Sequence, residues 1–176
     1  LAIVLAGRAL GLAPESIQKT MDEFKGLPNR LEYTNQVSGI RFYNDSKATN
    51  VDAAIRAVKS FDDPLILIAG GRHKGSDYHP LVQSCRGNVK GAVFMGEAAS
   101  LLAEAFTERV RAKNFSPLPF SLAENMKDAV SRAYALAKSG DIVLLAPACS
   151  SFDSFRDYDH RGRVFKTAVE DLLNGR

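Results

Sequence analysis

A run of seven residues, Asn44 to Asn50 (NDSKATN), is the part of the sequence best suited to chemistry. It follows an alternating apolar segment and precedes an alanine-rich amphipathic stretch, residues 51–61, so it occupies a strand-to-helix junction. Thr49 or Asn50 can cap the incoming helix, whose first N–H groups attract anions, and Lys47 adds a full positive charge. The loop therefore predicts an anion site, although a capped helix beside a solvated lysine is the commoner explanation of a single loop.

Two more loops follow apolar segments that we expect to be strands. Gly70 to Gly75 (GGRHKG) comes after residues 65–69, and its paired glycines would let backbone N–H groups approach a ligand closely. Pro147 to Asp153 (PACSSFD) comes after residues 142–146, and its Ser150-x-x-Asp153 spacing resembles a capping box. The repetition of such loops at equivalent strand ends favours a shared site over unrelated helix caps.

The side chains of these loops suit a small ligand with more than one carboxylate. Lys47 and Lys74 supply positive charge, and Thr49 and Ser151 supply hydroxyl donors, so each anionic group would find a partner. A dinucleotide-binding enzyme is disfavoured because the sequence has no G-x-G-x-x-G fingerprint, and a Walker A loop because Lys74 is followed by Gly75. A non-catalytic α/β interaction module is the other alternative.

Short apolar segments that alternate with amphipathic ones predict an α/β fold, a Rossmann-like, mostly parallel sheet with helices on both faces. Ligands bind such a sheet at the carboxyl ends of its strands, where the three loops lie. The expected strands are residues 65–69, 92–95 and 142–146, preceded by a hairpin of residues 31–37 and 40–43, and the expected helices are residues 51–61, 78–85, 98–106, 122–138 and 161–173.

The first 28 residues are expected to form a separate helical unit. Residues 1–10 and 17–24 both have helical patterns, and Gly26-Leu27-Pro28 then breaks the pattern. Two helices alone cannot close a core. We therefore place a boundary between residues 1–28 and an α/β domain at residues 29–176, and a start without methionine suggests a piece of something longer.

The composition is that of an ordinary globular protein, 45% hydrophobic and 24% charged over 176 residues. The 23 basic and 20 acidic residues are dispersed, so no nucleic-acid partner is expected. No apolar run reaches the roughly 18 residues of a membrane span and no targeting segment is evident, so a cytoplasmic monomer without a membrane contact is the default expectation. Two cysteines and three histidines lack metal-like spacing, so no metal site is expected.

Several residues near the third loop invite sharper claims than their surroundings support. Cys149 is expected to be a small buried packing residue, because the local sequence supplies no histidine partner for a nucleophile. Phe152, Phe155 and Tyr158 have helical spacing, which, apart from the edge of this cluster, favours a place in the core over a cofactor site. Arg161-Gly162 has no role that the sequence alone explains.

Three motifs together resemble a known family. They are the Asn44–Asn50 loop, the Gly-Gly-x-x-Lys-Gly-x-Asp loop at residues 70–77, and Pro-Ala-Cys-Ser-Ser-Phe-Asp-Ser-Phe-x-x-Tyr at residues 147–158 with Arg161-Gly162. They are similar to the carboxy-terminal domain of the Mur ligases, and the resemblance runs from the first residue to the last. The first loop resembles the branch that adds D-glutamate to the peptidoglycan precursor, and another Mur-type amino acid ligase is the alternative within the family.

The resemblance implies an ATP-dependent, amide-bond-forming ligase. ATP would phosphorylate the carboxylate of UDP-N-acetylmuramoyl-L-alanine, and the amine of D-glutamate would attack the resulting acyl phosphate. By position in the motifs, Lys47 would be catalytic and Arg30 and Asp45 would bind ATP. The D-glutamate site would comprise Thr49, Lys74, Ser151, Phe152 and Tyr158. Asn29 stands where many members have a histidine that packs on adenine, and Tyr158 where phenylalanine is frequent.

The resemblance also implies a division of labour among three domains, of which this chain would carry the last. ATP and Mg²⁺ would be held mainly by a central P-loop domain, whose tail would be residues 1–28. No G-x-x-x-x-G-K-[ST] sequence exists in the chain. We therefore expect this chain alone not to catalyse the reaction, and no cofactor or metal to bind it tightly.

Overall fold

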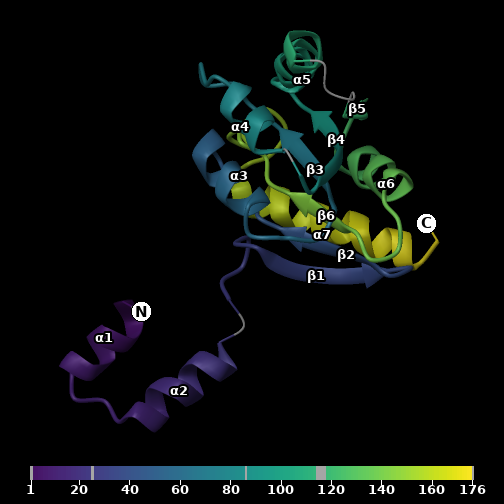
Figure 1. Cartoon of the computed structure of the whole chain (residues 1–176). Coiled ribbons are helices and arrows are strands. Elements are labelled where there is room, and N and C mark those ends of the chain that lie inside the picture. Colours follow the sequence, from purple (N-terminus) through teal and green to yellow (C-terminus); the bar gives the residue numbers. More distant parts are fainter. Residues whose placement is uncertain (1, 25, 86, 114–117, 176) are drawn as a thin grey trace.

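The computed structural model describes residues 2–24, 26–85, 87–113 and 118–175, and it confirms the expected α/β fold (Figure 1). Leu1, where the first expected helix begins, lies outside these residues. The strands are β1 (Glu32–Val37), β2 (Ile40–Asn44), β3 (Leu65–Gly70), β4 (Val89–Met95), β5 (Phe120–Ala123) and β6 (Ile142–Leu145). The helices are α1 (Ala2–Ala9), α2 (Pro14–Glu23), α3 (Val51–Val58), α4 (His79–Ser84), α5 (Ala99–Lys113), α6 (Met126–Leu136) and α7 (Tyr158–Leu173).

The order of the strands brings the three loops to one edge of the sheet. The strands form a six-stranded sheet in the order β1-β2-β6-β3-β4-β5, in which β1 and β2 are antiparallel and the other neighbours are parallel. Ile142 of β6 pairs with Arg41 of β2 on one side and with Leu65 of β3 on the other. The loops after β2, β6 and β3 therefore leave three adjacent parallel strands in the same direction.

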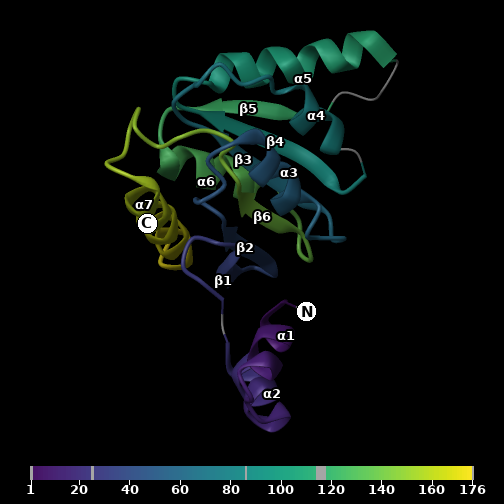
Figure 2. The ribbon, with the colours of Figure 1, turned by 90° about the vertical axis from the view of Figure 1, so that its left-hand side faces the viewer.

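Helices cover both faces of the sheet, as Figure 2 shows. Helices α3, α4 and α5 pack over one face, where Leu65, Leu67, Phe94 and Leu144 are buried. Helices α6 and α7 pack over the other, where the alternate strand residues such as Ile66, Ile68 and Leu145 are buried. A strand that is buried on both faces must be apolar throughout, which is why β3 and β6 have no polar side chain.

Local signals in the sequence mark several ends of these elements. Ser38 and Gly39 both have positive φ, as a tight hairpin turn between β1 and β2 requires. The side chains of Asn50, Asn125 and Asp157 accept a hydrogen bond from the backbone N–H three residues on, at the starts of α3, α6 and α7. Of the two candidate caps of α3, Asn50 rather than Thr49 is the residue used.

Several expected elements differ from the structure. Helix α3 ends at Val58 rather than at residue 61, β4 begins at Val89 rather than at residue 92, and α5 extends to Lys113 rather than to residue 106. The expected helix at residues 122–138 is shorter, because residues 120–123 form β5, which pairs with β4 at the edge of the sheet. A four-residue edge strand carries little local signal, and backbone pairing with β4 overrides the helical pattern. The last helix starts at Tyr158 rather than Arg161, because Asp157 caps it.

Helices α1 and α2 contribute little to the buried core. Figure 1 shows them apart from the sheet, below β1. Gly7 and Ile17 are their buried residues and lie against each other, whereas Ile3, Leu10 and Phe24 are exposed. Both apolar clusters begin only after residue 30. Among the described helices, none is long and apolar enough to span a bilayer.

Candidate functional site

The Asn44–Asn50 loop alternates between residues that face the interior and residues that face outward. Asn44, Ser46 and Ala48 are buried, whereas Asp45, Lys47 and Thr49 are only partly buried. Alternation of this kind continues the period of two of the preceding strand β2. The inward residues hold the loop, and the outward residues are the three that the sequence predicts to meet substrates.

Asn44 anchors the loop to the chain that enters β1. Its Nδ2 donates to Asn29 Oδ1 and to Glu32 Oε2, both at 2.9 Å, and its Oδ1 accepts from Ser46 N at 3.0 Å. Glu32 also accepts from Asn29 N at 2.9 Å and pairs with Lys166 at 3.0 Å. Burial raises the pKa of Glu32, but these hydrogen bonds and the Lys166 charge outweigh it and hold the pKa below its usual value. Asn29 is thus 3% exposed and committed to the protein interior.

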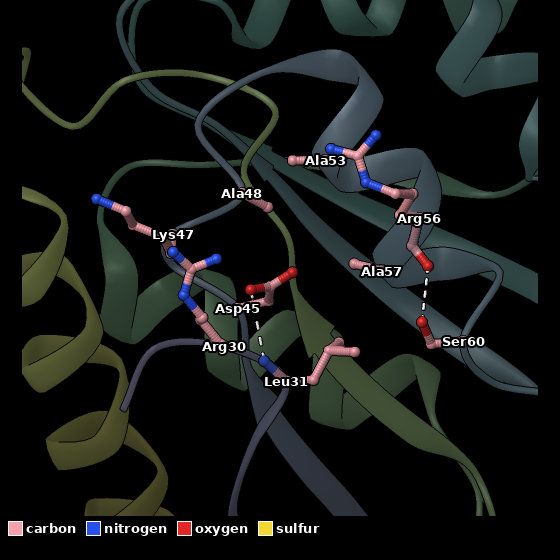
Figure 3. A pocket seen from close by; sticks show the side chains of 9 residues that line it. All are labelled: Arg30, Leu31, Asp45, Lys47, Ala48, Ala53, Arg56, Ala57 and Ser60. Carbon is pink, nitrogen blue, oxygen red and sulfur yellow. Dashed lines mark hydrogen bonds between the residues drawn. The ribbon is translucent and has the colours of Figure 1, made fainter. Parts of the chain in front are cut away.

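A hollow of about 230 Å³ lies beside this loop, between the start of β1 and helix α3. Figure 3 shows Arg30 and Lys47 on one side of it, Arg56 on the other, and Asp45 between them. Its apolar wall is made by Leu31 and three alanines of the first loop and α3. Three cations around a cavity of this size suit a phosphorylated ligand. The sequence-predicted residues Arg30, Asp45 and Lys47 are therefore brought together.

Asp45 is the acidic group in this hollow. Its backbone N–H donates to Leu145 O at 2.8 Å, which ties the residue to the end of β6. Burial raises the pKa of Asp45, and the Leu31 N–H and the Arg30 charge only partly oppose that rise. Its carboxylate accepts a single long bond from Leu31 N at 3.4 Å, so it has acceptor capacity left for hydroxyl groups of a ligand.

Lys47 lies over an aromatic ring, and the ion pairs of the described residues do not include it. Its Nζ is 3.7 Å from the centroid of the Tyr158 ring, a cation–π contact. Tyr158 is the first residue of α7, and Lys47 N donates to Asn29 O at 3.1 Å. The ring orients the ammonium group without neutralising it, so Lys47 remains able to pair with an anion.

Backbone hydrogen bonds join the three loops directly. Ala148 N donates to Ala48 O at 2.9 Å, and Arg72 N donates to Ser150 O at 2.9 Å. Arg72 and Ser150 also form an isolated antiparallel bridge. The loop after β6 is therefore the middle member of the set and connects the other two.

The expectation that Gly70 and Gly71 offer their N–H groups to a ligand is wrong. Gly70 N donates to Pro147 O at 2.8 Å and Gly71 N to Met95 O at 3.1 Å, so both are used inside the protein. A side chain at Gly70 would collide with Met95 O, and one at Gly71 with Ser150 O. These glycines allow the loops to pack closely on one another.

Two expectations for the third loop are also wrong. Ser150 and Asp153 form no capping box, because the helix begins only at Tyr158 and is capped by Asp157. Asp153 accepts instead from Glu97 N at 3.2 Å, before α5. Phe152 does not lie in the core, because residues 151–157 are turns rather than helix, and its side chain is 62% exposed.

The three residues predicted to hold carboxylates lie on the joined loops but not in the hollow. Thr49 is partly buried, Lys74 is exposed, and Ser151 is 2% exposed. None of the three lines the hollow that holds Lys47. Backbone hydrogen bonds join the loops, whereas the side chain of Lys74 is exposed at the surface.

Cys149 is buried, as expected, and is part of a short polar chain. Tyr78 Oη lies 3.2 Å from Cys149 Sγ and 3.0 Å from His73 Nδ1, which links the second and third loops. Burial raises the pKa of the Cys149 thiol, so the thiolate is disfavoured. The cysteine packs the second and third loops together.

Arg161 is the important residue whose role the sequence reasoning missed. It is 1% exposed, and its guanidinium reaches the first and third loops. A signal was available, because Arg161, Phe165 and Ala168 lie at helical spacing on the buried face of α7. A charged residue on such a face must find polar partners in the interior.

The described residues contain no group of three or more His, Cys, Asp or Glu side chains that could hold a metal ion.

The sequence model of the family described as "Mur ligase, glutamate ligase domain" matches residues 29–149. A protein of Pelotomaculum thermopropionicum named UDP-N-acetylmuramoylalanine–D-glutamate ligase is 42% identical over 99% of this chain and 37% of its own length. A ligase of the same name from Koribacter versatilis is 45% identical over 98% of this chain and 36% of its own. The chain thus spans a little over a third of the length of the curated relatives it matches.

Solved structures share the fold at low sequence identity. Escherichia coli FolC in complex with ADP has a TM-score of 0.62 at 17% identity, over 94% of this chain and 36% of that one. MurF ligase from Thermotoga maritima in complex with ADP has a TM-score of 0.60 at 15% identity, over 96% of this chain and 37% of that one. At such identities the likeness concerns the fold alone.

Proposed function

Because the chain belongs to the Mur ligase family, through its glutamate ligase domain, we propose that it acts in an ATP-dependent ligase that joins D-glutamate to UDP-N-acetylmuramoyl-L-alanine. The observation that carries the proposal is the joining of three loops at the carboxyl ends of β2, β6 and β3. They put hydroxyls, lysines and a cation-lined hollow at one edge of the sheet. Relatives that carry the D-glutamate ligase name support the choice of amino acid.

The hollow beside α3 would receive part of ATP. Arg30 would meet its phosphates, and Asp45, with its unused acceptor capacity, would accept from the ribose hydroxyls. Asn29 would not pack on the adenine as a histidine does at this position in many members of the family, since its side chain is hydrogen-bonded to Asn44 and Asp159 within the protein.

The joined loops would receive D-glutamate. Thr49, Lys74 and Ser151 would hold its carboxylates, with help from the backbone near Phe152 and from Tyr158. The side chain of Lys74 is exposed, and domain closure would bring it against a carboxylate of the substrate.

Lys47 would stand where the two substrates meet. ATP would transfer its terminal phosphoryl group to the alanine carboxylate and become ADP. The D-glutamate amine would then attack the acyl carbon, lose a proton and displace inorganic phosphate as the amide bond forms. Lys47 would stabilise the negative charge on the phosphoryl oxygens. The chain on its own is proposed to bind substrates but not to catalyse.

Titration of the chain with D-glutamate and with L-glutamate tests the proposal. Backbone amide resonances of Thr49, Lys74 and Ser151 should shift with D-glutamate and much less with its enantiomer. Lys74→Ala should weaken binding at least about tenfold, since a hydrogen bond to a charged group contributes roughly 1.5–3 kcal/mol. Lys59→Ala, an exposed lysine after α3, is the matched control and should bind as the unmodified chain does.

Other outcomes separate the alternatives. Shifts with a different amino acid but not with D-glutamate would place the chain in another amino acid branch of the family. An absence of shifts with any amino acid, in the presence of ATP as well, would favour a non-catalytic interaction module.

A further inference from the structure

Arg161 is a buried cation whose acidic neighbour in the described part of the chain is Asp153, which favours the charged form without forming an ion pair with it. Its side chain is 1% exposed, and the ion pairs of the described residues do not include it. Burial lowers the pKa of Arg161 to about 10, so the guanidinium is still protonated at neutral pH. The protein therefore holds a full positive charge directly beneath the loop edge of the sheet.

The guanidinium spans the first and third loops with four hydrogen bonds. Its Nε donates to Ser46 Oγ at 3.0 Å, and Nη2 donates to Ser46 O at 2.9 Å. Its Nη1 donates to Cys149 O at 3.1 Å and to Ser150 O at 3.2 Å. Ser46 Oγ in turn donates to Tyr158 O at 2.7 Å, which closes the connection to the start of α7.

The second loop also lies against this group. A side chain at Gly71 would come within 3.0 Å of Arg161 Nη1. One planar fork thus binds the first and third loops and lies close to the second. Lysine has a single point charge and could not reproduce the fork.

We propose that Arg161 is a positioning residue that fixes the separation between the loop of Thr49 and the loop of Ser151, and so shapes the D-glutamate site without touching the substrate. The inference rests on the proposed function. It explains why a guanidinium occupies this place, because an apolar side chain would leave Ser46 O, Cys149 O and Ser150 O without these donors. A loop spacing set by a rigid fork, with positive charge behind it, suits a ligand that carries two carboxylates.

Three substitutions test the proposal in the 176-residue chain. Arg161→Lys keeps the charge and removes the fork, and Ser46→Ala removes one acceptor with little change in volume. Arg163→Lys is the matched control, since Arg163 is an exposed arginine of the same helix that pairs with Asp159.

Amide hydrogen exchange gives the first measurement. In Arg161→Lys the amides of Ala148 and Arg72, which join the loops, should exchange about tenfold faster or more, and Ser46→Ala should change them in the same direction by less. The amide of Leu67 in β3 should be unchanged, as should all of these amides in the control. Exchange that matches the unmodified chain in both variants would overturn the proposal.

Substrate affinity gives the second measurement. The D-glutamate dissociation constant of Arg161→Lys should rise about tenfold or more, because small misplacements of binding groups are costly. In the complete ligase the D-glutamate KM should rise while the ATP KM changes by less than about twofold, since Asp45 keeps its own bond to Leu145. If the loop amides exchange faster but the affinity for D-glutamate is unchanged, Arg161 has a purely structural role.

The hydrogen-exchange measurement and the D-glutamate affinity measurement can fail independently of each other. If the unmodified chain and the complete ligase do not use D-glutamate, the proposed function is wrong and the role of Arg161 in that site falls with it. The exchange measurement then still decides whether Arg161 joins the loops.

Discussion

At the scale of single residues, alternate positions of the Asn44–Asn50 loop have different roles: some hold the loop in place and others face the hollow. Asn44 and Ser46 are fully buried and saturated with hydrogen bonds, whereas Asp45 and Lys47 line the hollow. Replacing an inward residue should therefore affect stability, and replacing an outward residue should affect ligands. The arrangement costs folding free energy at Asp45, because its carboxylate is partly removed from water and the Leu31 N–H and the Arg30 charge only partly offset this.

Asp45→Asn should stabilise the ligand-free chain at neutral pH. Burial raises the folded-state pKa of Asp45 above the usual 3.8, so its favourable contribution is complete below pH 3.8 and is lost as the pH rises through the folded pKa. Thermal unfolding of both proteins from pH 3 to pH 8 should show a higher melting temperature for Asp45→Asn at pH 7. The difference should shrink toward pH 3, and an equal gap at every pH would contradict the argument.

At the scale of elements, helix α7 organises the site from below. Its first turn supplies Tyr158 under Lys47 and Arg161 between the loops. Gly162 lets the helix approach the network of Asn29 and Asn44, because a side chain there would overlap Asn29 Oδ1 and come within 2.9 Å of Asn44 Nδ2. In the Arg161-Gly162 pair, the arginine thus binds the two loops, and the glycine lets α7 pack close enough for it to do so.

Gly162→Ala should lower the free energy of unfolding by about 1–3 kcal/mol, the usual cost of an extra group in a packed interior. Urea unfolding measures it, with Arg163→Ala as the control at the next, exposed position of the same helix. A gain in stability, as alanine normally gives in an open helix position, would show that the network around Asn29 yields easily.

At the scale of the whole molecule, the described residues divide into a two-faced sheet domain and a helix pair that buries little. Neither apolar cluster includes a residue of α1 or α2, and several of their large apolar side chains are exposed. We propose that the boundary near residue 28 separates units with independent stability. Leu27 should stay with the sheet domain, since its carbonyl accepts from Arg30 N at 3.2 Å.

The chain shortened to residues 27–176 should keep its fold. Its free energy of unfolding should lie within about 0.5 kcal/mol of that of the full chain, as for surface changes away from the core. Urea unfolding followed by near-ultraviolet circular dichroism would report the tertiary packing. A loss of several kcal/mol would mean that α1 and α2 do support the sheet.

Much of the fold could be predicted from the sequence because its signals are local. Each of these signals predicts its element without information from distant residues. They are the apolar runs at residues 65–69 and 142–146, the hairpin turn at Ser38-Gly39 and the asparagine that caps α3. The edge strand β5 could not be predicted in this way, since its partner β4 determines it. The polar loops could be identified as a candidate site, because residue type and position at strand ends suffice for that.

The sequence by itself determined most of the elements that form, which loops carry donors and charge, and, through its motifs, the family. Only the tertiary structure decided that β6 lies between β2 and β3, that the amides of Gly70 and Gly71 are used internally, and that Arg161 clamps the loops. The physical reason is distance along the chain. Arg161 and Ser46 are separated by 115 residues, so no local pattern can encode their contact, and only the packing of α7 beneath the sheet edge brings them together.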